Sequence, residues 1–286
     1  MTYTQKRSKI KIYMYQKSIV FLSPKHYSIQ TSHLFCQKSM DNRPNRREYL
    51  WWRLEWWFRR FLLLFFVISI FLLIQYKRQN PWMTPLMPIR LVDQIVDGRK
   101  IVLKHTRVPI KQISNNLIYG VIAWEDQRYL DHRGVDFQSL RKAFVYNVKY
   151  QRIGLWWSTI TQQTAKNVFL WPDRSLFRKA VEFYFALMME LLRSKERIVE
   201  IYLNIIEFWD GIYGVEQAAQ YYFNTSAAKL TQSQASFLVA MMPNPRYYQL
   251  HKRSYRLNSR KSIISSAINS MKRQKEIKAF VENTKK

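Results

Sequence analysis

Apolar residues gather first between residues 61 and 74, where the chain reads FLLLFFVISIFLLI. A helix over this stretch would be about 21 Å long, short of the roughly 30 Å of a bilayer's hydrocarbon core. Trp56 and Trp57 before it and Tyr76 after it extend the helix into the membrane interface. We therefore predict one transmembrane helix over residues 56–76. A buried core helix and a signal sequence are the alternatives, although the run begins late and no small-residue cleavage site follows it.

The segment before this helix, residues 1–55, is basic and lacks the pattern of a folded domain. Residues 1–39 contain no Asp or Glu and no sustained periodicity, which is typical of disorder. Met40 is an alternative translation start, in which case residues 1–39 would be absent from the native protein. By the positive-inside rule we expect the N-terminus in the cytoplasm and the bulk of the chain outside. The arginines that set this orientation are Arg43, Arg46, Arg47, Arg53, Arg59 and Arg60.

Beyond the anchor the pattern changes from extended to helical. Prolines predict an extended linker and membrane-proximal segment over residues 77–110. They stand at Pro81, Pro85 and Pro88. Apolar residues then recur with a helical period, so we predict a mainly α domain over residues 111–250. The expected helices cover 115–130, 137–149, 159–167, 175–192, 195–208, 215–222 and 231–241. Residues 251–286 are expected to form a basic C-terminal tail.

Charge and composition narrow the class of partner. The chain has 286 residues, with 47 Lys and Arg against 19 Asp and Glu, a net charge of +28. Such an excess indicates an anionic partner: nucleic acid, lipid headgroups or pyrophosphate. The 10 Trp and 18 Tyr favour a membrane interface. The chain has only 6 glycines and no G-x-G-x-x-G pattern, which disfavours a nucleotide-binding fold. Its histidines are scattered, which disfavours a zinc site. Cys36 is the single cysteine, so an intramolecular disulfide is excluded.

The first candidate for chemistry is EDQRYLDHRGVD, residues 125–136. Glu125, Arg128 and His132 are spaced to share one face of a helix that Gly134 would end. A carboxylate placed beside a guanidinium is a candidate base. Taken alone, an E-D pair on a helix is more typical of a solvated face.

The second candidate is a polar stripe in STITQQTAKN, residues 158–167. Ser158 is the expected N-cap, and the amides and ammonium of the stripe offer donors to sugar hydroxyls and phosphate oxygens. Alone, this would be a polar surface helix. The residues that share its face are Thr159, Gln162, Gln163 and Lys166.

Two further blocks lie on the next predicted helices. In RKAVE, Glu182 stands among apolar residues, so it is either buried with Arg178 as its partner or faces a cleft. A simple i,i+4 ion pair is the plainer interpretation. In KERIVEIYLN, residues 195–204, the apolar positions predict a core helix, with three polar residues as supports. These supports are Lys195, Tyr202 and Asn204.

Each block is weak alone, but their order and spacing resemble the glycosyltransferase family 51 domain over roughly residues 117–247. The closest likeness is to its monofunctional biosynthetic peptidoglycan transglycosylase branch, since no K-T-G motif of a transpeptidase occurs. The resemblance implies a lysozyme-like, mainly helical fold, with a large lobe and a smaller membrane-embedded jaw. It also implies polymerisation of lipid II by inverting transfer, with release of undecaprenyl pyrophosphate.

The resemblance also implies roles for individual residues. Glu125 would take the proton from the 4-hydroxyl of the acceptor's N-acetylglucosamine as that oxygen attacks C1 of the donor's N-acetylmuramyl unit. Glu182 would help the pyrophosphate depart, directly or through a divalent cation such as Mg or Mn. Donor and pyrophosphate binding would fall to Ser158, Thr159, Gln162, Gln163, Lys166, Asn167, Arg178 and Lys179. Support for the motif geometry would come from Asp126, His132, Gly134, Asp136, Lys195, Tyr202 and Asn204.

The implied location is the cytoplasmic (inner) membrane, with the catalytic domain in the periplasm or outside the cell. The implied partners are lipid II, the growing glycan chain, membrane lipids and proteins of cell division or cell-wall synthesis, and not nucleic acid.

The sequence departs from the family pattern where small residues are expected, and an indole cannot share every conformation open to glycine. These departures are Trp124, Trp156, Trp157 and Trp209. Two other functions stay open: a lysozyme-like enzyme that cleaves finished peptidoglycan, and an inactive membrane-anchored basic binding protein. The first would need no pyrophosphate-binding cations, and the second would not depend on Glu125.

Overall fold

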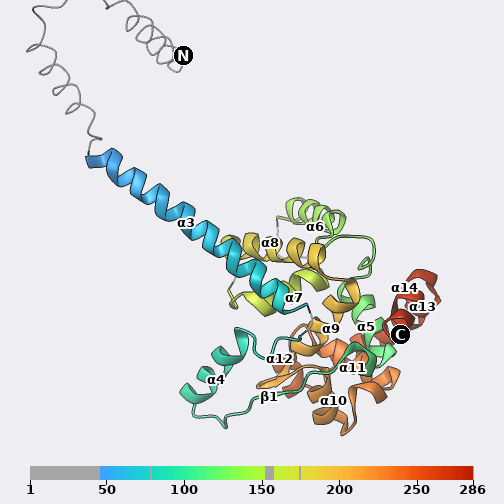
Figure 1. Cartoon of the computed structure of the whole chain (residues 1–286). Coiled ribbons are helices and arrows are strands. Elements are labelled where there is room, and N and C mark those ends of the chain that lie inside the picture. Colours follow the sequence, from blue (N-terminus) through green and yellow to red (C-terminus); the bar gives the residue numbers. More distant parts are fainter. Residues whose placement is uncertain (1–45, 78, 152–157, 174, 286) are drawn as a thin grey trace, which may run out of the picture. The chain divides into compact units, whose positions relative to one another are not determined.

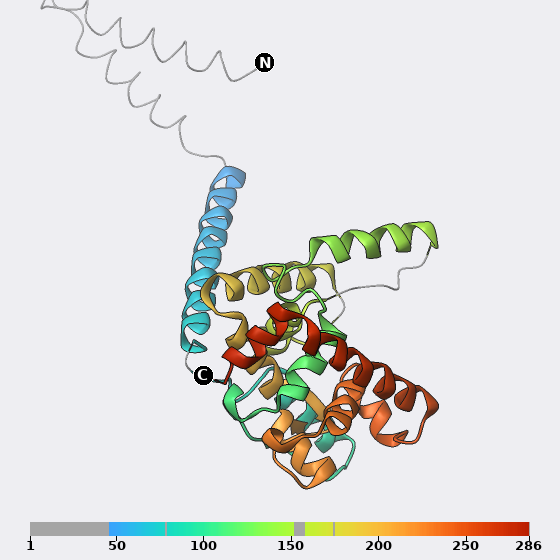
Figure 2. The same ribbon diagram turned by 90° about the vertical axis from the view of Figure 1, so that its right-hand side faces the viewer.

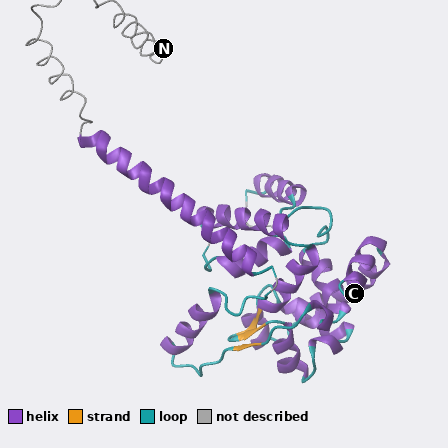
Figure 3. Cartoon of the chain, in the orientation of Figure 1, coloured by secondary structure: helices purple, strands orange, loops and turns teal. Residues whose placement is uncertain are grey.

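The computed structural model describes residues 46–77, 79–151, 158–173 and 175–285 (Figure 1). The chain forms two compact units, one ending at Phe66 and the other beginning at Val67, so the boundary falls inside helix α3 (Arg46–Gln75). The predicted mainly α fold is confirmed, because the described elements are helices apart from three short strands (Figure 3). The expectations for residues 1–39 and Met40 lie outside the described residues.

Helix α3 contains the predicted membrane span and is longer than expected. Its segment Tyr49–Gln75 has 27 residues and is long and apolar enough to cross a membrane, by length and composition. At 1.5 Å per residue this is about 40 Å, which exceeds the hydrocarbon core and reaches both interfaces. Only 11% of its apolar window is buried, which argues against the alternative of a core helix.

The segment expected to be an extended linker instead contains helix α4 (Leu86–Val96) and strand β1 (Lys104–His105). Pro85 is the N-cap of α4 and Pro88 lies in its first turn. Prolines are tolerated there, because the first backbone N–H groups of a helix have no partner within the helix. The prolines therefore mark the start of a helix, which the sequence analysis took for extended chain.

One group of helices forms the core behind the first motif. Helix α5 (Asn115–Glu125) is buried over residues 117–123 and packs against α11 (Gln232–Met241) and α13 (Tyr255–Arg273). Gly120 permits this packing, since an added Cβ would meet Val239 at 3.2 Å and Ile268 at 3.3 Å. Helix α14 (Lys275–Asn283) follows and also contacts α5 (Figure 2).

Residues 251–285, expected as a basic C-terminal tail, form helices that pack into the domain. Leu257, Ile264 and Ile268 of α13 and Val281 of α14 are fully buried, so both helices complete the core around α5. In the sequence these apolar positions form a stripe with a helical period, but basic residues lie between them and make the segment look like a basic tail.

A second group comprises α7 (Ile160–Phe169), α8 (Leu176–Leu192) and α9 (Lys195–Ile205), with α7 packed against both of the others. Helix α6 (Phe137–Lys149) has the predicted bounds, and α7 to α9 begin within one residue of the predicted positions. Ser or Thr N-caps set the starts of these three helices. These helices carry most of the candidate site.

The remaining elements close the domain. Strands β2 (Glu207–Trp209) and β3 (Ile212–Tyr213) form an antiparallel pair, and β1 adds in parallel to give the order β1-β3-β2. Lys104 pairs with Ile212 in this register. The other elements are the 3₁₀ turns Ile110–Gln112 and Ala227–Lys229 and the helices α10 (Val215–Phe223) and α12 (Pro245–Leu250).

Candidate active site

Glu125 is the last residue of α5, and the predicted helical face beyond it does not form. Asp126 leaves the helical conformation at φ −159° and ψ 75°. Arg128 consequently contacts Asp131 at 3.4 Å and Asp136 at 3.1 Å, and it does not pair with Glu125 as expected. The turn replaces the expected helix because the Asp126 side chain is held elsewhere by tertiary contacts.

The partner of Glu125 is an amide on α7. Gln163 Nε2 donates to Glu125 Oε2 at 2.7 Å and lies 3.4 Å from the carbonyl oxygen of Ser158. The buried Tyr202 hydroxyl donates to Gln163 Oε1 at 3.2 Å and so fixes the amide's orientation. Of these predicted residues, the structure therefore brings Glu125, Gln163 and Tyr202 together.

The environment of Glu125 favours the protonated carboxyl. Burial raises its pKa above the ordinary glutamate value, while the bond from Gln163 and the charge of Lys166 act in the opposite direction. A carboxylate in such surroundings binds a proton more strongly than an exposed one, which suits a general base.

Asp126 joins the end of α5 to the start of α7. His132 Nε2 donates to its two oxygens at 2.9 and 3.1 Å, and the backbone N–H of Ile160 donates to Oδ2 at 3.0 Å. Since a carboxylate accepts both bonds, His132 carries a proton on Nε2. The predicted support residues Asp126 and His132 thus position the segment that carries Glu125.

Thr159 and Gln162 are occupied within the protein. Thr159 is the N-cap of α7, in place of the expected Ser158, and forms a reciprocal capping box with Gln162. Its hydroxyl also donates to the carbonyl oxygen of Gly134 at 2.6 Å. Thr159 is 5% and Gln162 is 2% exposed, so both residues chiefly shape the site, and Thr159 also lines the cavity beside Glu125.

A cluster of cations surrounds Glu182 on α8. Arg178 Nη1 donates to Glu182 Oε2 at 2.7 Å, and Lys179 Nζ donates to Oε1. Lys179 also reaches the Ser158 hydroxyl at 2.9 Å. Glu182 is 1% exposed, so the alternative of a buried carboxylate with cationic partners is the one found.

Lys166 on α7 links this cluster to Glu125. Burial lowers its pKa, and Glu182 opposes that shift. Arg178 and Lys179 lower the pKa further, because their positive charges disfavour a third. The negative charges of Glu182 and Glu125 both raise the pKa of Lys166, against the effect of burial.

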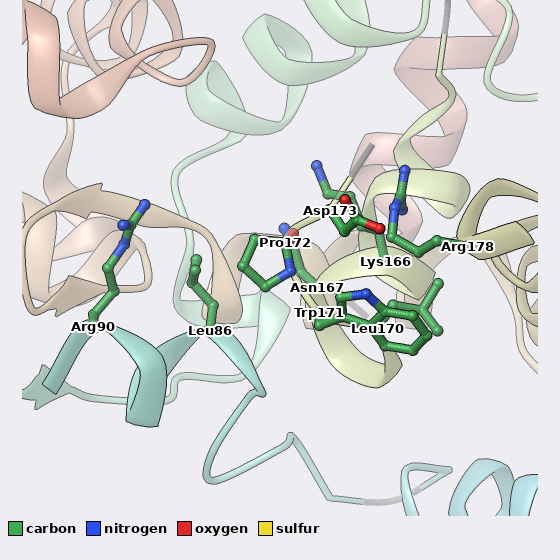
Figure 4. Close-up of a pocket in the computed structure, with 9 residues that line it drawn as sticks. All are labelled: Leu86, Arg90, Lys166, Asn167, Leu170, Trp171, Pro172, Asp173 and Arg178. Atoms are coloured by element: carbon green, nitrogen blue, oxygen red, sulfur yellow. The ribbon is translucent and has the colours of Figure 1, made fainter. Parts of the chain in front are cut away.

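Two cavities flank these residues. One, of about 430 Å³, has Lys166, Asn167 and Arg178 on one side and Leu86 and Arg90 of α4 on the other (Figure 4). A second, of about 450 Å³, opens beside Glu125. Its lining includes Trp124, Glu125, Asp136, Lys142, Tyr146 and Ser158. The carboxylate and the cations are thus each accessible from a hollow.

Lys195 supports the first motif through residues that the sequence analysis missed. Its ammonium donates to the carbonyl oxygen of His132 at 2.6 Å and to Glu190 Oε1 at 2.8 Å. The Thr161 hydroxyl donates to the same Glu190 oxygen at 2.6 Å, so one hydrogen-bond network joins α7, α8 and α9. A glutamate among the apolar residues of VEFYFALMMELL, five residues before Lys195, was the available signal.

The other predicted support residues act locally. Asp136 caps α6, accepting from the backbone of Gln138 and Ser139. Burial alone would raise the pKa of Asp136, but the bonds from Ser139 and the charge of Arg128 hold it below its ordinary value. Asn204 instead binds the backbone of Val108 through both its amide atoms at 2.8 Å, so it supports the chain near β1.

The described residues do not fit a divalent cation at Glu182. Its two oxygens already accept from Arg178 and Lys179. Among the residues that the structure describes, no group of three or more His, Cys, Asp or Glu could hold a metal. Cation chemistry at this site therefore rests on arginine and lysine.

The tryptophan departures are accommodated where the structure describes them. Trp124 lies within α5 and Trp209 ends β2, and neither has a positive φ. The close approach in the β2–β3 turn falls on Gly211, whose φ is 79° and whose added Cβ would collide with the carbonyl of Val102. Trp156 and Trp157 lie outside the described residues.

Comparison with known proteins identifies the family of the chain. A family model described as Transglycosylase matches residues 94–269, a longer span than the motifs alone. The biosynthetic peptidoglycan transglycosylase of Bacteroides thetaiotaomicron is 46% identical over 208 residues, covering 72% of this chain and 83% of that protein. The protein of the same name from Bdellovibrio bacteriovorus is 42% identical over 205 residues, covering 71% and 81%. The one from Thiobacillus denitrificans is 46% identical over 185 residues, covering 65% and 79%. The chain belongs to the transglycosylase family.

Proposed function

We propose that this chain is a membrane-anchored peptidoglycan glycosyltransferase that polymerises lipid II by inverting transfer and releases undecaprenyl pyrophosphate. The observation that carries the proposal is a half-buried carboxylate, Glu125, bonded to Gln163 of α7 and close enough to a cationic cluster on α7 and α8 that its charge acts on Lys166. The cluster consists of Lys166, Arg178 and Lys179 around Glu182. The relatives are named biosynthetic peptidoglycan transglycosylases, which supports the proposal.

In the proposed step Glu125 accepts the proton of the acceptor's 4-hydroxyl while that oxygen bonds to C1 of the donor sugar. The bond from C1 to the pyrophosphate oxygen breaks, and its electron pair leaves with the pyrophosphate. A positioned base typically contributes about 10²–10⁴ in rate. Cations fixed before the reaction stabilise the charge that develops on the leaving group, which supports roles for Lys166, Arg178 and Lys179.

Membrane attachment is supported by α3 and by the surface of the domain. Helix α3 provides a span of sufficient length. Large apolar side chains on α6 and α8 are exposed, as expected for a jaw that enters the bilayer surface. They include Phe144, Val145, Val148, Leu176, Phe177 and Leu191. By the positive-inside rule, the arginines before the span support an N-terminus in the cytoplasm and a catalytic domain outside.

The cationic cluster also separates this proposal from the two alternatives. An enzyme that only cleaves finished glycan has no diphosphate leaving group, so Lys166 and Arg178 beside a cavity would have no role. A basic binding protein would need solvated surface charge, whereas Arg178 is 8% exposed and its charge is directed to Glu182.

The test is polymerisation of lipid II by the full chain in vesicles. The unaltered protein and Glu282→Gln should give glycan polymer, because Glu282 is an exposed residue of α14 whose nearby salt bridge is to Lys278. Glu125→Gln should give none. Polymerisation by Glu125→Gln would overturn the base assignment, and release of soluble fragments from cell walls in place of polymer would favour a cleaving enzyme.

A further inference from the structure

The last turns of α3 belong to the second compact unit and pack against the helices that carry the candidate active site. Ser69 is 2% and Leu73 is 1% exposed, although both lie in an otherwise exposed apolar helix. The Ser69 hydroxyl forms a hydrogen bond of 2.8 Å with the hydroxyl of Tyr184 on α8. Ser69 lies six residues before the end of α3, which is about 9 Å along the helix axis. Part of α8 is therefore at the depth of the membrane span.

The end of α3 makes aromatic contact with α7 and, through it, α8. The ring of Tyr76 lies 5.9 Å from that of Phe169, the last residue of α7. Phe169 in turn stacks on Phe185 of α8, with centroids 4.3 Å apart and planes inclined by 10°. Aromatic pairs of this kind stabilise packing beyond the apolar area that they bury.

The third contact is with α9. The carbonyl oxygen of Tyr76 accepts from Arg197 Nε at 3.3 Å and from Nη2 at 3.2 Å. A helix leaves its final carbonyls without partners, and a guanidinium is a favourable cap for them. Arg197 also pairs with Glu200, which accepts from Asn80 at 3.1 Å and from the backbone N–H of Ile110 at 3.1 Å.

These contacts reach the same helices that supply the reacting groups. Helix α7 carries Gln163 and Lys166, α8 carries Glu182 two residues before Tyr184, and α9 carries Tyr202. We propose that the C-terminal end of the membrane helix is a positioning element of the active site, which sets the depth of α7, α8 and α9 relative to the bilayer. The inference rests on the proposed function, because it concerns how a substrate fixed in the membrane meets the site.

Two consequences distinguish this role from simple stabilisation. A substrate whose pyrophosphate is fixed at the bilayer surface reaches Lys166 and Glu125 only if the domain is held at the matching depth. A short-chain, water-soluble analogue of lipid II brings its pyrophosphate to the site from solution and does not need that depth. Loosening the contact should therefore impair the first substrate and spare the second.

The experiment uses the full chain in vesicles and compares initial rates on vesicle-borne lipid II with rates on the short-chain analogue. Ser69→Ala and Tyr184→Phe should each lower the rate on vesicle-borne lipid II by about threefold, the effect of one interhelical hydrogen bond. The double variant should lose no more than either single one, because both remove the same bond. All three should keep the rate on the soluble analogue.

Two matched changes serve as controls: Ile68→Ala, at an exposed neighbouring position of α3, and Tyr255→Phe, at an exposed tyrosine. Both should leave the two rates unchanged. Arg197→Lys tests the other contact, since it keeps a charge for Glu200 but loses the two-nitrogen cap on Tyr76, and it should give the same substrate split.

Equal losses on the two substrates, or no loss on either, would overturn the positioning role. Failure of the unaltered protein to polymerise either substrate would instead refute the proposed function. The two failures are therefore distinguishable.

Discussion

Replacing Asp126 with Asn should destabilise the domain and reduce activity together. The Asp126 carboxylate accepts from His132 Nε2 and from the backbone N–H of Ile160, and the residue is 7% exposed. An asparagine has one acceptor oxygen, and its NH₂ group would face one of these two donors. If the asparagine oxygen keeps the bond from Ile160, its NH₂ group takes the place of Oδ1 and faces the Nε2–H of His132 at 2.9 Å.

The magnitude follows from these contacts. A hydrogen bond to a charged group contributes about 1.5–3 kcal/mol, and the remaining bond to a neutral amide about 1 kcal/mol. We expect the free energy of unfolding to fall by about 2–3 kcal/mol. Because Asp126 ties the end of α5 to the first turn of α7, Glu125 should also shift relative to Gln163. A displacement of about 1 Å costs on the order of 10²-fold in rate.

The assay is chemical denaturation in detergent together with the rate of lipid II polymerisation. Asp131→Asn is the matched control, because Asp131 is 52% exposed and its contact with Arg128 is 3.4 Å long. An exposed pair of this kind contributes less than about 1 kcal/mol, so the control should resemble the unaltered protein. If Asp126→Asn unfolds at the same denaturant concentration as Asp131→Asn, the tie between α5 and α7 is not what holds Glu125.

Two further predictions concern stability. Glu125→Gln should raise the free energy of unfolding near pH 7, because burial raises the pKa of Glu125 in the folded protein. The unfolded chain loses this proton at the ordinary glutamate value and the folded chain only at a higher pH, so stability falls across that window. The stability gained by Glu125→Gln should vanish below about pH 4, and thermal unfolding of the variant and the unaltered protein near pH 7 and below pH 4 checks this. Gly134→Ala should cost about 2–4 kcal/mol, because Gly134 has φ 82° and an added Cβ would lie 2.8 Å from the carbonyl oxygen of Ala186. Gly98→Ala, at φ 63° with nothing within 4 Å, should cost only about 1–2 kcal/mol, and equal losses in denaturation would contradict the packing argument.

Local signals in the sequence predicted the starts of helices α5 to α11 to within one residue. Helix α6 begins after Asp136, whose carboxylate caps its first N–H groups, and α11 begins after Thr231, which forms a capping box with Gln234. In both cases the N-cap side chain accepts hydrogen bonds from the first backbone N–H groups of the helix. The boundary is therefore set locally, without a distant part of the chain.

The errors arose where tertiary contacts override local preference. The segment after Glu125 has a helical spacing, but the Asp126 side chain bonds to two groups outside that helix. One is His132, beyond the turn, and the other is the backbone N–H of Ile160, 34 residues further along the chain. Pro85 and Pro88 suit a first helical turn as well as extended chain, and the burial of Met87 and Gln94 against the domain favours the helix.

The sequence predicted which residues belong to the candidate site better than it predicted which of them contact one another. The sequence placed Glu125, Gln163 and the cations in one region, yet it paired Glu125 with Arg128, where the structure pairs it with Gln163. Spacing along one helix cannot show which side chain of another helix will face it. Glu190 was missed for the same reason, since its role depends on Thr161 and Lys195 from two other helices.

The central claim is that Glu125 acts as the base from a half-buried position beside Lys166, and the pH dependence of polymerisation tests it most directly. The base must be ionised, and burial raises the pKa of Glu125, so the rate should rise with pH through a value above that of an ordinary glutamate. Gln163→Met removes the hydrogen bond that favours the ionised form, and it should move this limb to a still higher pH. A limb at or below the ordinary glutamate value, or one that Gln163→Met leaves in place, would contradict the account.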